Sequence, residues 1–297
     1  MKIGVTGANS AVGKHLLKQY GGGDEFDFVA GVRSEKAAQS IPKVPGVTPA
    51  VVRFNDSEGL AEAFEGCSAI IHLAGILFET RESTYEIANV QATRAVVETA
   101  ERLGNVQLIF VSALGADAKS SNGYLRSKGV CEELISNAAI PSTIIRTPLL
   151  LGPGTAGGQT LLRDARRRET WLLGGGKHRL RPLDVDDLCR AMLGVCRQLP
   201  EGKFVYELVG PESLRYRELV ELTARSLGGQ VRIRAVPIGL AKLAASAARM
   251  VTGAGMSRDI IEVITTSEDV DRNGNGELAT ELTALRVTIE KIVREKS

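Results

Sequence analysis

The first seventeen residues, MKIGVTGANSAVGKHLL, constrain the fold more than any other stretch of this chain. A short apolar run at 3–5 leads to Gly7, a second glycine follows at Gly13, and a helical pattern begins with Leu16 and Leu17. Strand, tight turn and helix in this order are what a dinucleotide-binding βαβ unit requires. Gly7 can take a backbone conformation that a Cβ would forbid. Loop amides and the helix N-terminus would then face a pyrophosphate.

The glycine pattern departs from the full motif at one position. Glycines are expected at Gly7, position 10 and Gly13, and position 10 is Ser10. Two glycines of three are a weak signal alone, but their place between a strand and a helix strengthens it. We expect a phosphate-binding loop whose corner is narrowed by a serine.

Strand and helix signals alternate along residues 1–150, which predicts a Rossmann-type doubly wound parallel sheet of the α/β class. The expected strands after the first are 26–32, 50–54, 68–73, 106–111 and 142–145, and the main helices are 58–64, 85–103 and 123–136. Basic and glycine-rich pieces follow, so residues 151–297 are assigned mainly to a smaller substrate lobe. Residues 184–209 are expected to return to the first domain. The alanine-rich stretch 238–256 is read as lobe or lid packing, with a partner-facing or membrane-facing surface as the alternative.

Composition bounds the partners and the compartment. The net charge is +2 over 297 residues, which favours neither nucleic acid nor a membrane surface. No apolar run is long enough to span a bilayer, and no signal peptide precedes the first strand. Four scattered cysteines and three histidines lack metal-ligand spacing, so we expect reduced thiols, no metal site and a cytoplasmic protein.

A second strong signal is the stretch Tyr124-Leu125-Arg126-Ser127-Lys128. Tyr124 and Lys128 are four apart, so on a helix they project from one face. An ammonium near a phenol lowers the pKa of the phenol, and such a tyrosine can transfer a proton at neutral pH. The pair follows the fifth expected strand, which favours a functional role over decoration of an exposed helix.

These stretches together resemble the extended and atypical short-chain dehydrogenase/reductases. The resemblance is carried by TGANSAVG at 6–13, HLAG at 72–75, NVQAT at 89–93, YLRSK at 124–128, IIRTPLLLGPG at 144–154 and RPLDVDDL at 181–188. VSALGAD at 111–117, followed closely by YLRSK, is most similar to the branch that includes the NADPH-binding accessory subunit of respiratory complex I. Relatives often form dimers through the two helices here at 85–103 and 123–136. A homodimer or association with a larger complex is therefore expected.

The resemblance implies a role for each matching residue. Arg33, at the end of the second strand, suits the 2′-phosphate of NADP(H), whereas a carboxylate there would bind the ribose hydroxyl of NAD. Tyr124 is implied as the acid/base and Lys128 as its ribose-binding partner. Ser112 is implied on the nicotinamide side, and Ser112, Ser120 or Ser121 could supply the hydroxyl that active members place beside the tyrosine. The remaining implied cofactor contacts are Gly7, Asn9, Ser10, Ala11, Val12, Gly13, Ser34, Phe54, Asn55, Ala74, Gly75, Val111, Thr147 and Pro148.

Two departures from the family pattern bear on function. Leu114 stands where active members carry a serine or threonine that binds the substrate carbonyl, and Arg53 stands where many relatives carry an acid near the adenine. The expected activity is an NADP(H)-dependent oxidoreductase acting on a small-molecule substrate, with NAD(H) as the alternative cofactor. Leu114 favours a non-catalytic NADP(H)-binding accessory or assembly protein instead. A sugar-nucleotide epimerase, which would hold NAD, is a third alternative that Arg33 opposes.

Overall fold

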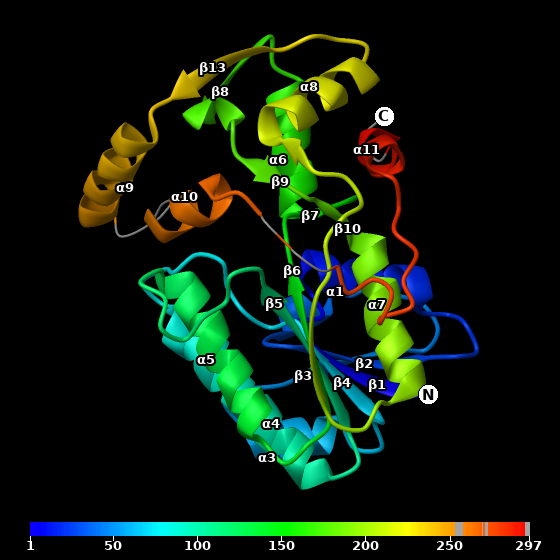
Figure 1. The fold of residues 1–297 in the computed structure, drawn as a ribbon. Coiled ribbons are helices and arrows are strands. Elements are labelled where there is room, and N and C mark those ends of the chain that lie inside the picture. Colours follow the sequence, from blue (N-terminus) through cyan, green and yellow to red (C-terminus); the bar gives the residue numbers. More distant parts are fainter. Residues whose placement is uncertain (253–257, 269, 271–272, 295–297) are drawn as a thin grey trace.

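The computed structural model describes residues 1–252, 258–268, 270 and 273–294, and a seven-stranded sheet forms its centre (Figure 1). Every neighbouring pair in this sheet is parallel, in the order β11-β6-β5-β4-β1-β2-β3. The strands are β1 (Lys2–Thr6), β2 (Asp27–Val32), β3 (Val47–Val51), β4 (Ala69–His72), β5 (Gln107–Ala113), β6 (Ser142–Thr147) and β11 (Lys203–Glu207). The predicted doubly wound Rossmann-type sheet is therefore confirmed.

Helices bury both faces of the sheet, which is why its strands are apolar throughout. One face is covered by α1 (Ala11–Tyr20) and α7 (Val185–Gln198), and the other by α3 (Ser57–Ala63), α4 (Ala92–Leu103) and α5 (Gly123–Asn137). Successive residues of β4 show the alternation, because Ile71 packs in the core with α1 and α7 while Ile70 packs in the core with α3, α4 and α5. The short α2 (Glu35–Ala38) follows β2.

Two elements differ from the sequence-based prediction. The third strand was expected at 50–54, after Pro49, but β3 spans Val47–Val51 and contains that proline. β3 lies at the edge of the sheet, where a proline without an N–H is tolerated. The helix expected at 85–103 begins with a π-helical turn, η1 (Glu86–Gln91), before α4. Such turns are rare and often mark functional sites.

A smaller lobe with its own apolar core stands beyond the carboxyl ends of the strands (Figure 1). Its core joins α6 (Ala156–Ala165), α8 (Tyr216–Ser226) and α11 (Leu285–Arg294) through Leu161, Leu219 and Ile289. Short strands and a 3-10 turn complete it: β7 (Leu150–Leu151), β8 (Glu169–Leu173), η2 (Gly174–Gly176), β9 (Arg179–Leu180), β10 (Leu183–Asp184), β12 (Leu214–Arg215) and β13 (Arg232–Val236). Two helices, α9 (Ile238–Thr252) and α10 (Arg258–Thr265), follow β13.

The chain leaves the lobe and re-enters it. α7 packs against α1, and β11 hydrogen-bonds to β6 as the edge strand of the central sheet, before β12 and α8 rejoin the lobe. All four cysteines are buried free thiols. Across the described part of the chain, every helix is too short or too polar to cross a bilayer.

Candidate active site

The predicted cofactor residues gather at one edge of the sheet. Because all strands are parallel, their carboxyl ends meet there, and the sequence-predicted residues lie at or just after the ends of β1 to β6. The switch in strand order falls between β1 and β4, the position where open α/β sheets bind ligands. The loop 7–13 and Ala74 lie directly at this switch point.

The first loop has the close packing that glycine allows. Gly7 has φ of +65°, and a Cβ there would lie 2.7 Å from the backbone nitrogen of Ala74. A Cβ on Gly13 would lie 2.5 Å from the carbonyl oxygen of Ala8. Gly7 thus permits the contact between two loops, and Gly13 lets α1 start close to the loop that precedes it.

Ser10 has a structural reason for replacing the middle glycine. It is the N-cap of α1, and its Oγ accepts a hydrogen bond from the Gly13 amide at 3.0 Å. Its backbone is extended, with φ of −65°, so no glycine is required there. Asn9, Ala11 and Val12 flank it, half-buried or exposed. The serine at position 10 therefore stabilises the start of α1 as its N-cap.

Arg33 and Arg53 lie at adjacent strand ends. Val32 pairs with Val51 in register, and the Val52 amide donates to the Val32 carbonyl at 2.8 Å. Both arginine side chains are exposed, and no carboxylate of the described residues forms an ion pair with either. Of the other predicted adenosine-side residues, Ser34 caps α2 through the Ala37 amide, Phe54 is half-buried and Asn55 is exposed.

Tyr124 and Lys128 lie on α5, beside the end of β5. Lys128 is 9% exposed, and its Nζ donates to the Val111 carbonyl at 2.7 Å and lies 4.2 Å from the centre of the Phe110 ring. Burial lowers the pKa of Lys128 to about 8. Tyr124 is half-buried, and its ring lies 5.9 Å from that of Tyr85.

The pKa of Tyr124 moves opposite to the sequence-based expectation. Lys128 was expected to lower it, but burial raises it, and the neighbouring Tyr85 and Cys131 raise it further. The ammonium of Lys128 instead donates to the Val111 carbonyl. In this structure Tyr124 is therefore a protonated phenol at neutral pH and a weaker acid than a solvent-exposed tyrosine.

The other predicted residues around β5 and β6 are more enclosed. Ser112 is 3% exposed, and its Oγ is buried without a hydrogen-bond partner. Thr147 is buried and donates to the Ser112 carbonyl at 3.2 Å, while Pro148 and Leu114 are half-buried. As the side chains stand, neither Ser112 nor Leu114 offers a surface hydroxyl beside Tyr124.

Sequence reasoning did not assign a site role to Asn89. It lies in the π-helical turn η1, and its side chain accepts from the Ile76 amide at 2.8 Å and donates to the Ser127 hydroxyl at 2.9 Å. A Cβ on Gly75 would lie 3.0 Å from its Oδ1. Asn89 thus joins the loop after β4 to α5, the helix of Tyr124. Its place in the NVQAT stretch was a usable signal.

Asp259 was also missed, and no local pattern identifies it. Its Oδ2 accepts from the Gly123 amide at 3.1 Å, and its carbonyl accepts from the Asn122 side chain at 2.9 Å. This carboxylate sits at the positive end of α5, one residue from Tyr124. α10 therefore connects the lobe to α5, the helix of Tyr124. An open cavity of about 770 Å³ lies beside it, lined by Pro237, Gly239, Leu240, Lys242, Leu243, Arg258, Asp259 and Glu262.

His72 has a structural role in the core. Its Nδ1 lies 2.6 Å from the Thr6 hydroxyl, its Nε2 lies 3.0 Å from the Thr93 hydroxyl, and its ring stacks on Phe110. Burial lowers the pKa of His72 to about 3, so the ring is neutral. It links β1, β4 and α4 beneath the site.

The arrangement fits a nicotinamide dinucleotide. The contact between Gly7 and Ala74 leaves no space for a Cβ, the α1 N-terminus faces the loop, and buried Ser112 Oγ lacks a partner near the end of β5. Loop and helix donors suit a pyrophosphate. Gly7, Ser10 and Gly13 would hold it, and Lys128 would reach the ribose.

Comparison with known proteins agrees with this geometry. The family model described as NAD(P)H-binding matches residues 7–170. The chain is 26% identical over 259 residues to NADH dehydrogenase [ubiquinone] 1 alpha subcomplex subunit 9, mitochondrial, of Arabidopsis thaliana, covering 82% of this chain and 62% of that one. It is 23% identical over 240 residues to a ceramide reductase of Caulobacter vibrioides, covering 79% and 73%. The solved structure of MoeE5 with UDP-glucuronic acid and NAD has a TM-score of 0.76 at 20% identity, covering 100% of this chain and 99% of that one.

The fold and the dinucleotide loop define a nicotinamide-nucleotide-binding Rossmann protein. The chain belongs to the NAD(P)H-binding family, among the extended short-chain dehydrogenase/reductases that its motifs resemble. The chain spans 62% of the length of the plant relative, so that protein's assembly does not transfer with the likeness.

Proposed function

We propose that the protein is an NADP(H)-dependent oxidoreductase that reduces a carbonyl or oxidises an alcohol, with Tyr124 and Lys128 as its acid/base pair. The observation that carries the reaction type is the position of Tyr124 and Lys128 at the carboxyl end of β5, where Lys128 Nζ donates to the Val111 carbonyl at 2.7 Å. The bound nicotinamide supplies the hydride. The chain's own residues hold the cofactor, orient the substrate and move the proton.

The preference for NADP(H) rests on Arg33 and Arg53. Their strand ends are neighbours through Val32 and Val51, both side chains are exposed, and both carry a permanent positive charge. Two adjacent guanidinium groups repel each other, and a dianionic 2′-phosphate between them offsets that repulsion. The uncharged 2′-hydroxyl of NAD(H) does not offset that repulsion. Arg53, where relatives carry an acid, therefore acts with Arg33 in this proposal.

Tyr124 is protonated at neutral pH, which is the form that the reducing direction requires. A protonated phenol donates its proton to the oxygen of a carbonyl as hydride reaches the carbon. Lys128, buried and cationic at neutral pH, holds its position against Val111 and Phe110, and in this proposal it binds the cofactor ribose. Asn89 and Asp259 are positioning residues, because they hold α5 at Ser127 and at Gly123 without being assigned contact with substrate.

Calorimetric titration with NADPH and NADH tests the cofactor. NADPH is expected to bind more tightly, and Arg33→Ser and Arg53→Ser are each expected to weaken NADPH binding on the order of tenfold while changing NADH binding little. Arg94→Ser on α4, which removes an exposed arginine from a helix, is the matched control. Equal affinity for the two nucleotides, or preference for NADH, would sink the NADP(H) proposal and favour the epimerase alternative.

A non-catalytic NADP(H)-binding protein is the second candidate, favoured by one observation. The Ser112 Oγ is buried and Leu114 is apolar, so neither of these two residues displays a hydroxyl to a substrate carbonyl. Tyr124→Phe separates the two candidates with a panel of aldehydes and ketones and NADPH. If the protein is an enzyme, we expect Tyr124→Phe to lower turnover at least about a hundredfold and to leave NADPH affinity unchanged. NADPH binding without turnover in the parent chain, or turnover that Tyr124→Phe leaves unaltered, contradicts the catalytic assignment.

A further inference from the structure

We propose that the cavity between α9 and α10 receives the hydrocarbon chain of the molecule that reacts at Tyr124, so that the substrate is a long-chain aldehyde or ketone. The inference rests on the proposed oxidoreductase function and adds the class of its substrate. The carbonyl carbon takes the hydride of NADPH and the carbonyl oxygen takes the Tyr124 proton, which gives the alcohol and NADP⁺. The chain itself is bound and does not react.

The cavity, of about 770 Å³, meets the helix of Tyr124 at Gly123. Asp259 lines the cavity, and its Oδ2 accepts a hydrogen bond from the Gly123 amide. A Cβ on Gly123 would lie 2.8 Å from that oxygen and 3.6 Å from the ring of Tyr85, which in turn lies 5.9 Å from the ring of Tyr124. Cavities of this volume hold ligands far larger than a simple aldehyde. A molecule held at Tyr124 therefore has a large cavity beside its non-reacting part.

Helix α9 gives the cavity an apolar wall. Leu240 and Leu243 line it, are three residues apart on one helix face, and are each 62% exposed. Pro237, directly before α9, also lines it. A hydrocarbon chain laid against these side chains removes the apolar surface of both from water, which favours binding.

The charged residues of the lining are already engaged within the protein. Asp259 accepts from the start of α5, and the Oε2 of Glu262 accepts from the Asn122 side chain at 3.4 Å. Lys242 and Arg258 are likewise engaged with other groups of the chain. The lining thus holds two carboxylates and two cations, and its charges balance. Such a lining does not select an ion, and what it offers a ligand is mainly its apolar wall.

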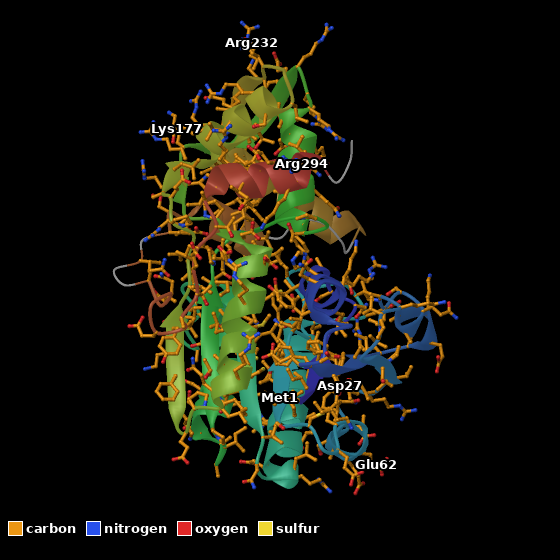
Figure 2. The ribbon with its side chains drawn as sticks, turned by 90° about the vertical axis from the view of Figure 1, so that its right-hand side faces the viewer. Met1, Asp27, Glu62, Lys177, Arg232 and Arg294 are labelled. Atoms are coloured by element: carbon orange, nitrogen blue, oxygen red, sulfur yellow. The ribbon has the colours of Figure 1, made fainter. Side chains whose placement is uncertain are left out.

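A sugar nucleotide suits this cavity poorly. Its diphosphate is anionic, and Asp259 and Glu262 would repel it. Other cations of the lobe do not offset this repulsion, because among the described residues only Lys242 and Arg258 bring positive charge to the lining. Figure 2 shows labelled Arg232, one of those other cations, at the outer end of the lobe. The lining therefore favours an uncharged chain over the substrates of the epimerase alternative.

Gly239, in the first turn of α9, leaves part of the cavity open. A Cβ at this position would have no atom of the described residues within 4 Å, so close packing does not require a glycine here. Glycine also disfavours a helix relative to alanine. The space that it leaves on the cavity wall gives this glycine a reason.

The loop after β4 brings further apolar side chains to the vicinity of Tyr124. The Tyr85 hydroxyl donates to the Leu77 carbonyl at 2.9 Å, which holds this loop beside the Tyr85 ring. Leu77 and Phe78 are both exposed. The surroundings of the proposed proton donor thus resemble the cavity wall in being apolar.

Chain length is the variable that tests the proposal. The full chain is assayed with NADPH and straight-chain aldehydes from propanal to dodecanal. Burial of one methylene strengthens binding up to about fourfold. We therefore expect kcat/KM to rise with each methylene and to be at least about a hundredfold higher for dodecanal than for propanal.

A binding assay without NADPH separates the cavity from catalysis. The uncharged apolar fluorophore N-phenyl-1-naphthylamine is bound to the protein, and its fluorescence is followed as an alcohol is added. We expect dodecan-1-ol to displace the fluorophore and propan-1-ol at the same concentration to leave it bound.

Variants locate the chain in the cavity. Leu240→Ser with Leu243→Ser removes the apolar wall, and Gly239→Trp fills the open space. Each is expected to lower the ratio of kcat/KM for dodecanal to that for propanal on the order of tenfold, and to weaken dodecan-1-ol binding by a similar factor.

Matched controls lie outside the cavity. Leu222→Ser with Val287→Ser removes exposed apolar side chains from α8 and α11. Gly23→Trp enlarges an exposed loop glycine that also has room for a Cβ. These variants should keep the chain-length ratio of the parent. Circular dichroism and unchanged NADPH affinity verify that every variant folds.

The outcomes separate this inference from the proposed function. Turnover of carbonyl compounds without preference for long chains, or a preference that the cavity variants leave unchanged or lower no more than the controls do, overturns the chain site and leaves the oxidoreductase standing. Displacement by dodecan-1-ol that the cavity variants weaken, without NADPH oxidation by any aldehyde, supports the chain site and overturns the oxidoreductase. Failure of dodecan-1-ol to displace the fluorophore overturns the chain site.

Discussion

Lys128 is expected to lower the stability of the unliganded protein at neutral pH. Burial lowers the pKa of Lys128 from 10.5 to about 8, so the folded state binds its proton more weakly than the unfolded state. Below about pH 8 the side chain is charged in both states and the full cost of burying the charge is present; it amounts to about 3 kcal/mol. As pH rises from 8 toward 10.5, the folded chain releases the proton first and the penalty disappears.

Lys128→Met removes the charge while keeping most of the side-chain volume. The variant loses the hydrogen bond to the Val111 carbonyl and the contact with the Phe110 ring, which together offset part of the gain. We expect the variant to be more stable than the parent chain at about pH 7 by about 1–2 kcal/mol. The stability advantage of the variant is expected to fall by about 2 kcal/mol between about pH 7 and about pH 9.5, because the folded parent releases the Lys128 proton and no longer buries a charge.

Urea unfolding of both proteins at the two pH values, without nucleotide, measures the effect. Lys18→Met, an exposed control on α1, should show no comparable pH-dependent difference. A difference between Lys128→Met and the parent that is the same at both pH values would refute the assignment of a depressed pKa. The variant should also bind NADPH more weakly, which would make Lys128 a residue retained for function at the expense of stability.

Three further predictions concern the residues around the site. His72 is neutral with a pKa of about 3, so the parent chain should lose about 3 kcal/mol of stability between about pH 6.5 and pH 4, and His72→Gln should lose correspondingly less in the same unfolding series. Ser10→Ala should lower the free energy of unfolding by about 1 kcal/mol because it removes the α1 cap, whereas Ser10→Gly should cost only a few tenths; equal losses would contradict the cap. Asp259→Asn should lower kcat at least about threefold with little change in NADPH affinity, since it loosens the start of α5, and an unchanged kcat would count against this positioning role.

The sequence predicted the central sheet well because its signals are local. Apolar runs such as 68–73 can be buried only between two helical layers, and the turn at Gly7 admits few alternatives. The third strand was misplaced because Pro49 was read as a strand boundary, whereas its position at the sheet edge removes the penalty for a missing N–H. Edge position is a tertiary property that the local sequence does not contain.

The site was predicted only in part, because some of its contacts also depend on tertiary structure. Residues that follow strand ends could be placed together from the parallel topology alone. The direction in which the pKa of Tyr124 shifts could not be predicted, because it depends on burial beside Tyr85 and Cys131 and on the hydrogen bond that Lys128 makes to Val111. Asp259 reaches Gly123 from 136 residues away, and no spacing rule covers such a distance.

The contact between α10 and α5 also affects the order in which parts of the chain can fold during synthesis. During synthesis, residues 1–147 can in principle pair β1 to β6 before the lobe exists, but the Gly123 amide gains the Asp259 carboxylate only after the chain has grown through α10. The sheet that carries the dinucleotide loop can therefore form early, while the start of the Tyr124 helix is completed late. A nascent chain would therefore form its dinucleotide loop before the helix that carries Tyr124, the proposed proton donor, is held by the lobe.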